Sequence, residues 1–112
     1  MDKIIEGNKL IAEFDGWDKT NHIDEAFGNL YIKDGESAYA NDFIYELSWE
    51  WLMPVLEKIN TLKYPYLISH KTCSIYKVWQ QEFISHEHGK TTIEATWNAV
   101  IQFIEWYNKN KK

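Results

Sequence analysis

The 112-residue sequence contains one cysteine, no arginine and no long hydrophobic run. Cys73 has no second cysteine to pair with inside the chain, which excludes the small disulfide-rich class and fits a reducing compartment. No apolar stretch approaches the roughly 18 residues that a membrane-spanning helix needs, and the first residues do not resemble a signal peptide. We therefore expect a soluble, cytoplasmic protein with no membrane partner.

All 12 basic residues are lysines. The planar arginine fork, which pairs with guanine edges and phosphates through two hydrogen bonds, is therefore missing. This absence argues against direct, sequence-specific nucleic-acid binding. The chain also has no glycine-rich phosphate-binding loop, no Gly-x-Ser-x-Gly nucleophile elbow and no HExxH metal-binding motif. We therefore expect a protein that is not an enzyme, with no catalytic residues and no cofactor.

Only two prolines and five glycines interrupt the chain, and no linker or repeat divides it. With 45% hydrophobic residues, a chain of this length can bury a core without a disulfide or a structural metal. These observations predict a single domain over residues 1–112.

The net charge of −5 is unevenly distributed. Residues 1–57 carry 13 acidic side chains and four lysines, whereas residues 58–112 carry four glutamates and eight lysines. An acidic first half forms either a solvated surface or a surface that engages a basic partner.

Two segments in the first part of the chain have the spacing of amphipathic helices. The first is residues 2–14, ending at Gly16, which can adopt the left-handed conformation of a helix stop. The second is residues 45–62. Pro54 is expected to kink this second helix, which begins either near its first residue or at Ser48 as N-cap.

A third helix has the clearest start of all. Thr91 and Glu94 form a capping box, and an apolar stripe at helical spacing continues to about Asn108.

The region between the first two helices contains one strand signal. Residues 17–29 are polar and irregular, which predicts a loop with at most one helical turn. Residues 30–32 are expected to form a short strand, which a turn at Asp34-Gly35 folds against residues 38–39.

Residues 65–70, 72–78 and 82–86 alternate well enough for three further strands. The order of helices and strands predicts an α+β fold, in which a small antiparallel sheet is layered with about three helices, like an α/β/α sandwich.

Three stretches have a familiar combination of residues. They are NKLIAEF followed by Gly16-Trp17, SWEWLMPVLEKI at residues 48–59, and IEATWNAV at residues 93–100 continuing to Trp106-Tyr107-Asn108. Together they resemble the phage ABA sandwich domain family, small proteins of tailed bacteriophages and prophages. The resemblance implies a layered fold and a phage accessory protein acting in the cytoplasm of a bacterial host. It transfers no catalytic motif.

His86-Glu87-His88 is the nearest approach to a metal-ligand motif. Alternate residues on a strand point the same way, so two imidazoles could share a metal with His70 or Cys73. Polar residues are also expected there because a turn follows. A zinc-dependent hydrolase at His70, His86 and His88 is therefore a distant alternative, and Cys73 is expected to be a buried structural thiol.

Aromatic residues make up 16% of the chain, and six of them are tryptophans. Trp49 and Trp51 lie about 200° apart around a helix, so they cannot both join one core stripe. Surplus aromatics favour a phage counter-defence protein that sequesters a small nucleotide-type signal, stacking its base on aromatic rings and meeting its phosphate with lysine. The candidate ligand-binding residues are Trp17, Trp51, Lys77, Trp79, Lys90 and Trp106.

The acidic first half supports an alternative function, an inhibitor that engages a basic surface of a host nucleic-acid-binding or defence enzyme. The candidate interface residues are Asp15, Asp18, Asp24, Glu25, Asp34, Glu36 and Asp42. Aromatic residues on more than one side of the helices also favour a homo-oligomer.

Overall fold

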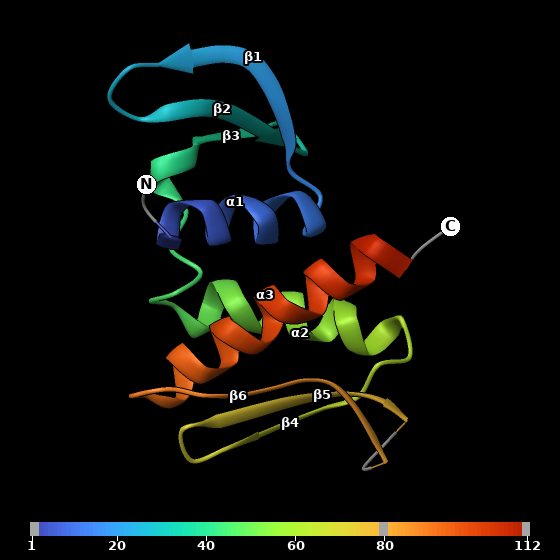
Figure 1. The fold of residues 1–112 in the computed structure, drawn as a ribbon. Helices are drawn as coiled ribbons and strands as arrows, with labels where there is room; N and C mark the ends of the chain where they lie inside the picture. Colours follow the sequence, from blue (N-terminus) through green and yellow to red (C-terminus); the bar gives the residue numbers. More distant parts are fainter. Residues whose placement is uncertain (1–2, 79–80, 111–112) are drawn as a thin grey trace. The chain divides into compact units, whose positions relative to one another are not determined.

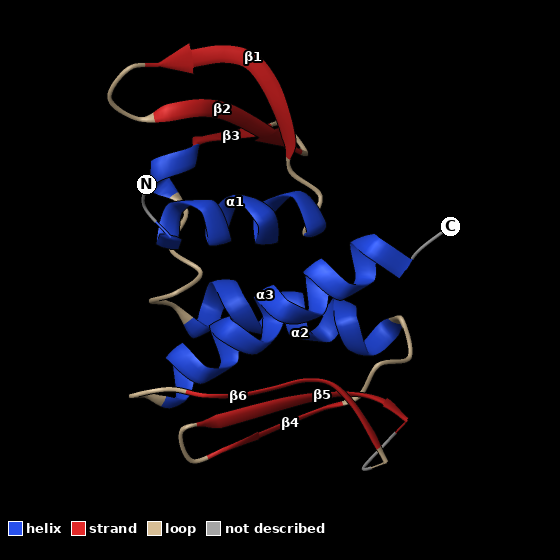
Figure 2. Cartoon of the chain, viewed as in Figure 1, coloured by secondary structure: helices blue, strands red, loops and turns tan. Residues whose placement is uncertain are grey.

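The computed structural model describes residues 3–78 and 81–110. Within them, three α-helices, a short 3₁₀-helix and six strands in two antiparallel sheets form an α+β fold (Figure 1; Figure 2). The predicted class and the three helices are confirmed, but two three-stranded sheets replace the one sheet expected.

The chain divides into two compact units, Met1–Ile44 and Tyr45–Lys112. A single domain over residues 1–112 stays a prediction.

The first unit combines one α-helix with a three-stranded sheet of order β1-β2-β3. Its elements are α1 (Lys3–Phe14), β1 (Asp18–Asp24), β2 (Gly28–Lys33), β3 (Glu36–Tyr39) and the 3₁₀-helix η1 (Ala40–Asp42). The first predicted helix, over residues 2–14, is confirmed from Lys3 onward, and its predicted first residue, Asp2, lies outside the described residues. Gly16 follows α1 with φ +105°, a conformation that glycine adopts without strain.

Residues 17–29, expected to form a loop, instead contain strand β1. Most side chains of β1 are exposed, so the strand lacks the apolar alternation by which a sequence reveals a half-buried strand. It is held by pairing with β2, where Asp18 lies opposite Ile32, and the register is irregular between Lys19 and Ile23. The loop prediction was wrong because this edge strand is held by backbone pairing with β2 rather than by burial of its side chains.

The predicted turn at Asp34-Gly35 joins β2 to β3. Both residues have positive φ, +51° for Asp34 and +84° for Gly35, as a type I′ hairpin turn requires. Lys33 and Glu36 pair across the turn. The hairpin therefore presents the turn residues and Glu36 at one end of the first sheet.

The core of the first unit lies between α1 and the sheet (Figure 1). Tyr31 of β2 is fully buried, and its ring packs edge to face on Phe43 with a centroid distance of 5.3 Å. The Trp17 ring also packs edge to face on Phe43, with a centroid distance of 5.3 Å. The buried Asn8 side chain donates to the Phe43 carbonyl at 3.1 Å.

The second unit packs two helices with a sheet of order β4-β5-β6. Its elements are α2 (Trp49–Thr61), β4 (Tyr66–Ser69), β5 (Thr72–Val78), β6 (Glu82–His88) and α3 (Thr92–Asn110). Both predicted helices and all three predicted strands are confirmed. Helix α3 contacts all three strands along one face of the sheet (Figure 2).

Side-chain caps fix the starts of both helices. The Ser48 hydroxyl accepts from the Trp51 backbone N–H at 3.4 Å, so α2 begins at the second of its two predicted starts. The Thr91 hydroxyl accepts from the Glu94 N–H at 3.1 Å. The Glu94 carboxylate in turn accepts from the backbone N–H of Lys90, one residue before the position that a capping box uses.

The second core is formed by the apolar faces of α2, α3 and β5. Its most deeply buried side chains include Leu52, Val55, Leu56, Ile59, Cys73, Ile75, Val100, Phe103 and Ile104. Pro54 lies inside α2, and the kink expected there stays a prediction. Every helix in the described part of the chain is too short or too polar to cross a lipid bilayer.

Candidate functional site

The first sheet has one face on α1 and one face exposed. Tyr31 points toward α1, where its hydroxyl donates to a Glu13 carboxylate oxygen at 3.5 Å. Strand neighbours alternate in direction, so Leu30 and Ile32 point the opposite way. We call this opposite side the outer face of the first sheet. By strand register it carries Asp18, Leu30, Ile32, Ser37 and Tyr39.

Exposed apolar and aromatic side chains lie along the outer face. Ile32 is 46% exposed and Phe27, in the turn before β2, is 51% exposed. Phe27 packs on Tyr39 with a centroid distance of 5.9 Å, and the Tyr39 hydroxyl lies 3.4 Å from His22 Nε2. The outer face thus has an apolar centre and a small aromatic cluster at one end.

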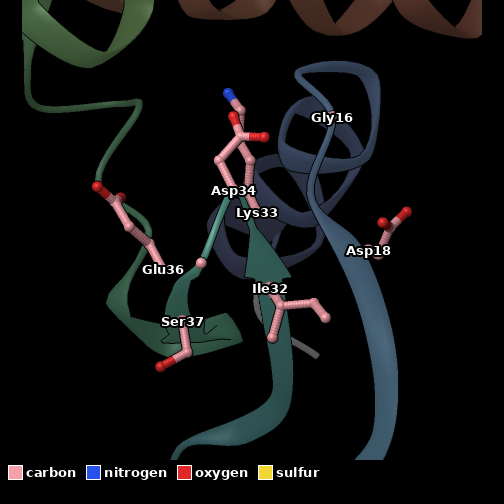
Figure 3. A pocket seen from close by; sticks show the side chains of 8 residues that line it. Gly16, Asp18, Ile32, Lys33, Asp34, Glu36 and Ser37 are labelled. Atoms are coloured by element: carbon pink, nitrogen blue, oxygen red, sulfur yellow. The ribbon is translucent and has the colours of Figure 1, made fainter.

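An open pocket of about 270 Å³ lies at the other end of the outer face (Figure 3). It is lined by Gly16, Asp18, Ile32, Lys33, Asp34, Gly35, Glu36 and Ser37. Figure 3 shows Asp18 on one side of Ile32 and Glu36 on the other. Lys33 forms an ion pair with Asp15 at 3.4 Å, which sets its positive charge against a carboxylate of its own unit.

The seven predicted interface carboxylates all belong to the first unit, and four of them gather at the pocket end. Asp18, Asp34 and Glu36 line the pocket and are exposed. Asp15 approaches the same end through its ion pair with Lys33. One lysine and four carboxylates therefore gather at this end of the first sheet, which carries excess negative charge.

The other three predicted carboxylates lie at the aromatic end. Asp24 accepts from the backbone N–H of Ala26 at 2.7 Å and of Phe27 at 3.0 Å, so it shapes the turn between β1 and β2. Asp42 accepts from the backbone N–H of Tyr39 at 3.1 Å. Glu25 is exposed in the same turn as Asp24. Carboxylates therefore flank the outer face at both ends.

The two units also differ in net charge. Residues 1–44 contain ten acidic side chains and four lysines, a net charge of −6. Residues 45–112 contain seven acidic side chains and eight lysines, a net charge of +1. The acidic character of the whole chain thus comes from the unit that carries the outer face.

Three of the four tryptophans predicted to bind a ligand pack on other aromatic rings of their own units. Trp17 lies on Phe43, as described above. Trp51 packs edge to face on Tyr45 with a centroid distance of 5.4 Å. Trp106 packs on Tyr64 at 5.7 Å. All three tryptophans are half-buried.

One tryptophan of the α2 pair does face outward, as expected. It is Trp49, which is 39% exposed, rather than the candidate Trp51. Trp79 lies outside the described residues. Lys77 and Lys90 are exposed on the second unit. The pocket described above contains none of the six candidate ligand-binding residues, and nucleotide sequestration stays a prediction.

The three predicted zinc ligands do not come together as a group. His86 and His88 are neighbours on β6, with ring centroids 5.1 Å apart, while His70 lies in the turn between β4 and β5. In residues 3–78 and 81–110, no three histidine, cysteine or acidic side chains are placed to hold a metal ion together. The geometry therefore gives no support to the three-histidine hydrolase.

Cys73 is a buried thiol, as expected. Burial raises the pKa of Cys73 to about 11, although a hydrogen bond with the Thr96 side chain acts in the opposite direction. The reactive thiolate is therefore scarce at neutral pH.

We expect native Cys73 to resist thiol reagents. At pH 8, an aromatic disulfide reagent should label Cys73 at least about tenfold more slowly than in urea, because the folded thiol is both covered and protonated. The release of coloured thiolate measures both rates. Equal rates in the two conditions would contradict the buried position.

Only part of the outer face could be predicted from the sequence. The sequence pointed to the acidic residues but not to Ile32, Phe27, Tyr39 or His22, because its pattern predicts a loop where the structure has β1. One signal for the outer face was available in the stretch Leu30-Tyr31-Ile32. In a strand, Leu30 and Ile32 point to the face opposite Tyr31, so burial of Tyr31 turns the other two outward. Comparisons of this chain with models of protein families, with curated proteins and with solved structures found no match.

Proposed function

We propose that the first unit is a binding module that occupies a basic surface of another protein. The function would be inhibitory, since a partner that needs its basic surface for nucleic acid or another anionic substrate loses access to it. The resemblance of the sequence to small phage proteins supports a partner in a bacterial host. This function is the inhibitor that the acidic residues suggested as the alternative to nucleotide sequestration.

One observation carries the proposal: the exposed apolar side chains of the outer face lie between groups of carboxylates at the two ends of the first sheet. Ile32 and Phe27 are about half exposed. Asp18, Asp34 and Glu36 lie beside Ile32 around the pocket. An apolar centre within a polar rim is the arrangement typical of protein interfaces.

The charge of the first unit selects the kind of partner. With a net charge of −6 over 44 residues, it repels anionic molecules such as nucleotides and nucleic acids. It attracts a basic surface and accelerates association with it at low salt. The positive charge of Lys33 does not cancel the negative potential of the first unit, because Lys33 forms an ion pair with Asp15 at 3.4 Å.

The test compares two double charge reversals. Asp34→Lys with Glu36→Lys changes two exposed carboxylates at the pocket, whereas Glu82→Lys with Glu105→Lys makes the same change in charge on the second unit. Proteins retained from a bacterial lysate at low salt are identified by mass spectrometry, and their affinity is then measured with purified partner.

The pocket reversal is expected to weaken binding at least about tenfold at low salt, and the difference should shrink as salt rises. The control reversal should leave most of the affinity. If no basic protein is retained at low salt, or if both variants lose affinity equally, the proposed function is wrong.

A further inference from the structure

The second sheet also has a face turned away from its helix, and this face carries two histidines. Cys73 points toward α3, because its side chain interacts with Thr96 of that helix. Its neighbour Ser74 therefore points the other way. Ser74 lies opposite His86 on β6, and His88 follows two residues later on the same side. Both imidazoles are exposed.

We propose that His86 and His88 form a two-histidine site for a late first-row divalent metal ion, of which zinc is the reference. Their ring centroids are 5.1 Å apart and their planes are nearly perpendicular, at 87°. Two imidazoles bound to one tetrahedral ion through Zn–N bonds of about 2.0–2.1 Å have ring centres roughly 5 Å apart. The two rings already lie at about that separation in the structure.

Ser74 supports the orientation that a metal ligand needs. Its hydroxyl oxygen lies 2.6 Å from His86 Nδ1, and the serine is only 5% exposed. When Nδ1–H donates to this oxygen, the Nε2 lone pair of His86 remains available to a metal. Metal-binding histidines are commonly held in this way by a hydrogen bond on the nitrogen that does not bind the ion.

Phe83 restrains His86 from the side opposite His88. The Phe83 and His86 rings are 4.9 Å apart and tilted by 36°, and Phe83 packs in turn on Tyr76 at 5.0 Å. By strand register the positions beside the histidines on this face are Ser69, Thr72, Leu67 and Ser74, none of them basic. A metal cation therefore meets no fixed positive charge among these neighbours.

The site is an open one. In the described part of the chain, no third histidine, cysteine or acidic side chain joins the pair. Two protein ligands leave coordination positions for solvent or for a donor on another molecule. Imidazole nitrogen favours zinc, nickel and copper over magnesium, which prefers oxygen ligands.

Titration calorimetry of the full chain with zinc, and separately with magnesium, tests the site. We expect one zinc ion per chain and no magnesium binding. Ser74→Ala should weaken zinc binding by about 10–100-fold, and His86→Asn or His88→Asn by more. His70→Asn and His22→Asn are matched controls that should bind zinc like the unmodified protein.

Histidine ¹⁵N chemical shifts during the zinc titration give a readout that does not depend on affinity. Zinc should shift Nε2 of His86 while Nδ1 remains protonated. His88→Asn, an exposed change, keeps the test usable if Ser74→Ala does not fold.

Three results would each overturn the proposal. They are no zinc binding by the unmodified protein, unchanged binding after loss of either His86 or His88, and loss of binding in the His70→Asn control. The proposed interface of the first unit is tested with other residues, so either proposal can fail alone.

Discussion

Replacing Phe103 by alanine is expected to lower the free energy of unfolding by about 3–5 kcal/mol. Phe103 lies in α3 and is fully buried. Its ring stacks on Tyr107 at a centroid distance of 5.7 Å and meets Tyr64 edge to face at 5.2 Å. The alanine variant loses the transfer free energy of the ring and leaves a cavity that neighbouring aromatic rings cannot fill without moving.

Urea unfolding followed by circular dichroism measures this effect. Phe103→Leu keeps most of the buried volume and should cost less than half as much. Gln102→Ala, on the exposed side of the same helix, should stay within about 0.5 kcal/mol of the unmodified protein. A small loss for Phe103→Ala, similar to that for Gln102→Ala, would mean that this aromatic cluster does not hold the second unit together.

The second prediction is that Tyr31 destabilises the first unit in alkali. Burial, followed by the charge and hydrogen bond of Glu13, raises the pKa of Tyr31 from 10.0 to about 12. An unfolded chain therefore releases this proton at a lower pH than the folded chain does. The stabilisation is complete below pH 10 and is lost as the pH rises from 10 toward 12.

Tyr31→Phe removes this titration while keeping the ring on Phe43. At neutral pH the variant should differ by less than about 1 kcal/mol, because the hydrogen bond that it loses is long, at 3.5 Å. Near pH 11 it should gain about 1.4 kcal/mol relative to the unmodified protein. Urea unfolding at both pH values tests the difference.

Ultraviolet titration provides an independent check on Tyr31. The unmodified protein should show a late-ionising tyrosine that is absent from Tyr31→Phe. Tyr66, whose pKa is also raised by burial and by Glu57, should still ionise late in the variant. If the absorbance change that the variant lacks falls near pH 10, Tyr31 is not shielded from water.

The helices could be predicted from sequence because their signals are local. Ser48 caps α2, Thr91 caps α3, and Gly16 follows the end of α1, as the spacing of these residues indicated. Strand β1 could not be predicted in the same way. Its partner, β2, lies farther along the chain, and a polar edge strand has no periodicity that distinguishes it from a loop.

The candidate site was predictable in charge but not in shape. Every acidic residue proposed for the interface belongs to the first unit, because charge is a property of sequence position. The exposed partners Ile32 and Phe27 depend on which way each strand neighbour points, which follows only once the register is known. The aromatic surplus misled for the opposite reason, since Trp17, Trp51 and Trp106 contact other rings within their units.

The burial of Cys73 has a practical consequence for spectroscopy. The only thiol of the chain is fully buried, so a cysteine introduced on the surface can carry a fluorophore or spin label almost alone. Lys19→Cys offers such a position on the first sheet, outside the pocket lining, and Asn108→Cys one on the second unit, since both residues are exposed. A doubly labelled chain would report the distance between the acidic sheet and α3 in solution, and its change when a partner binds.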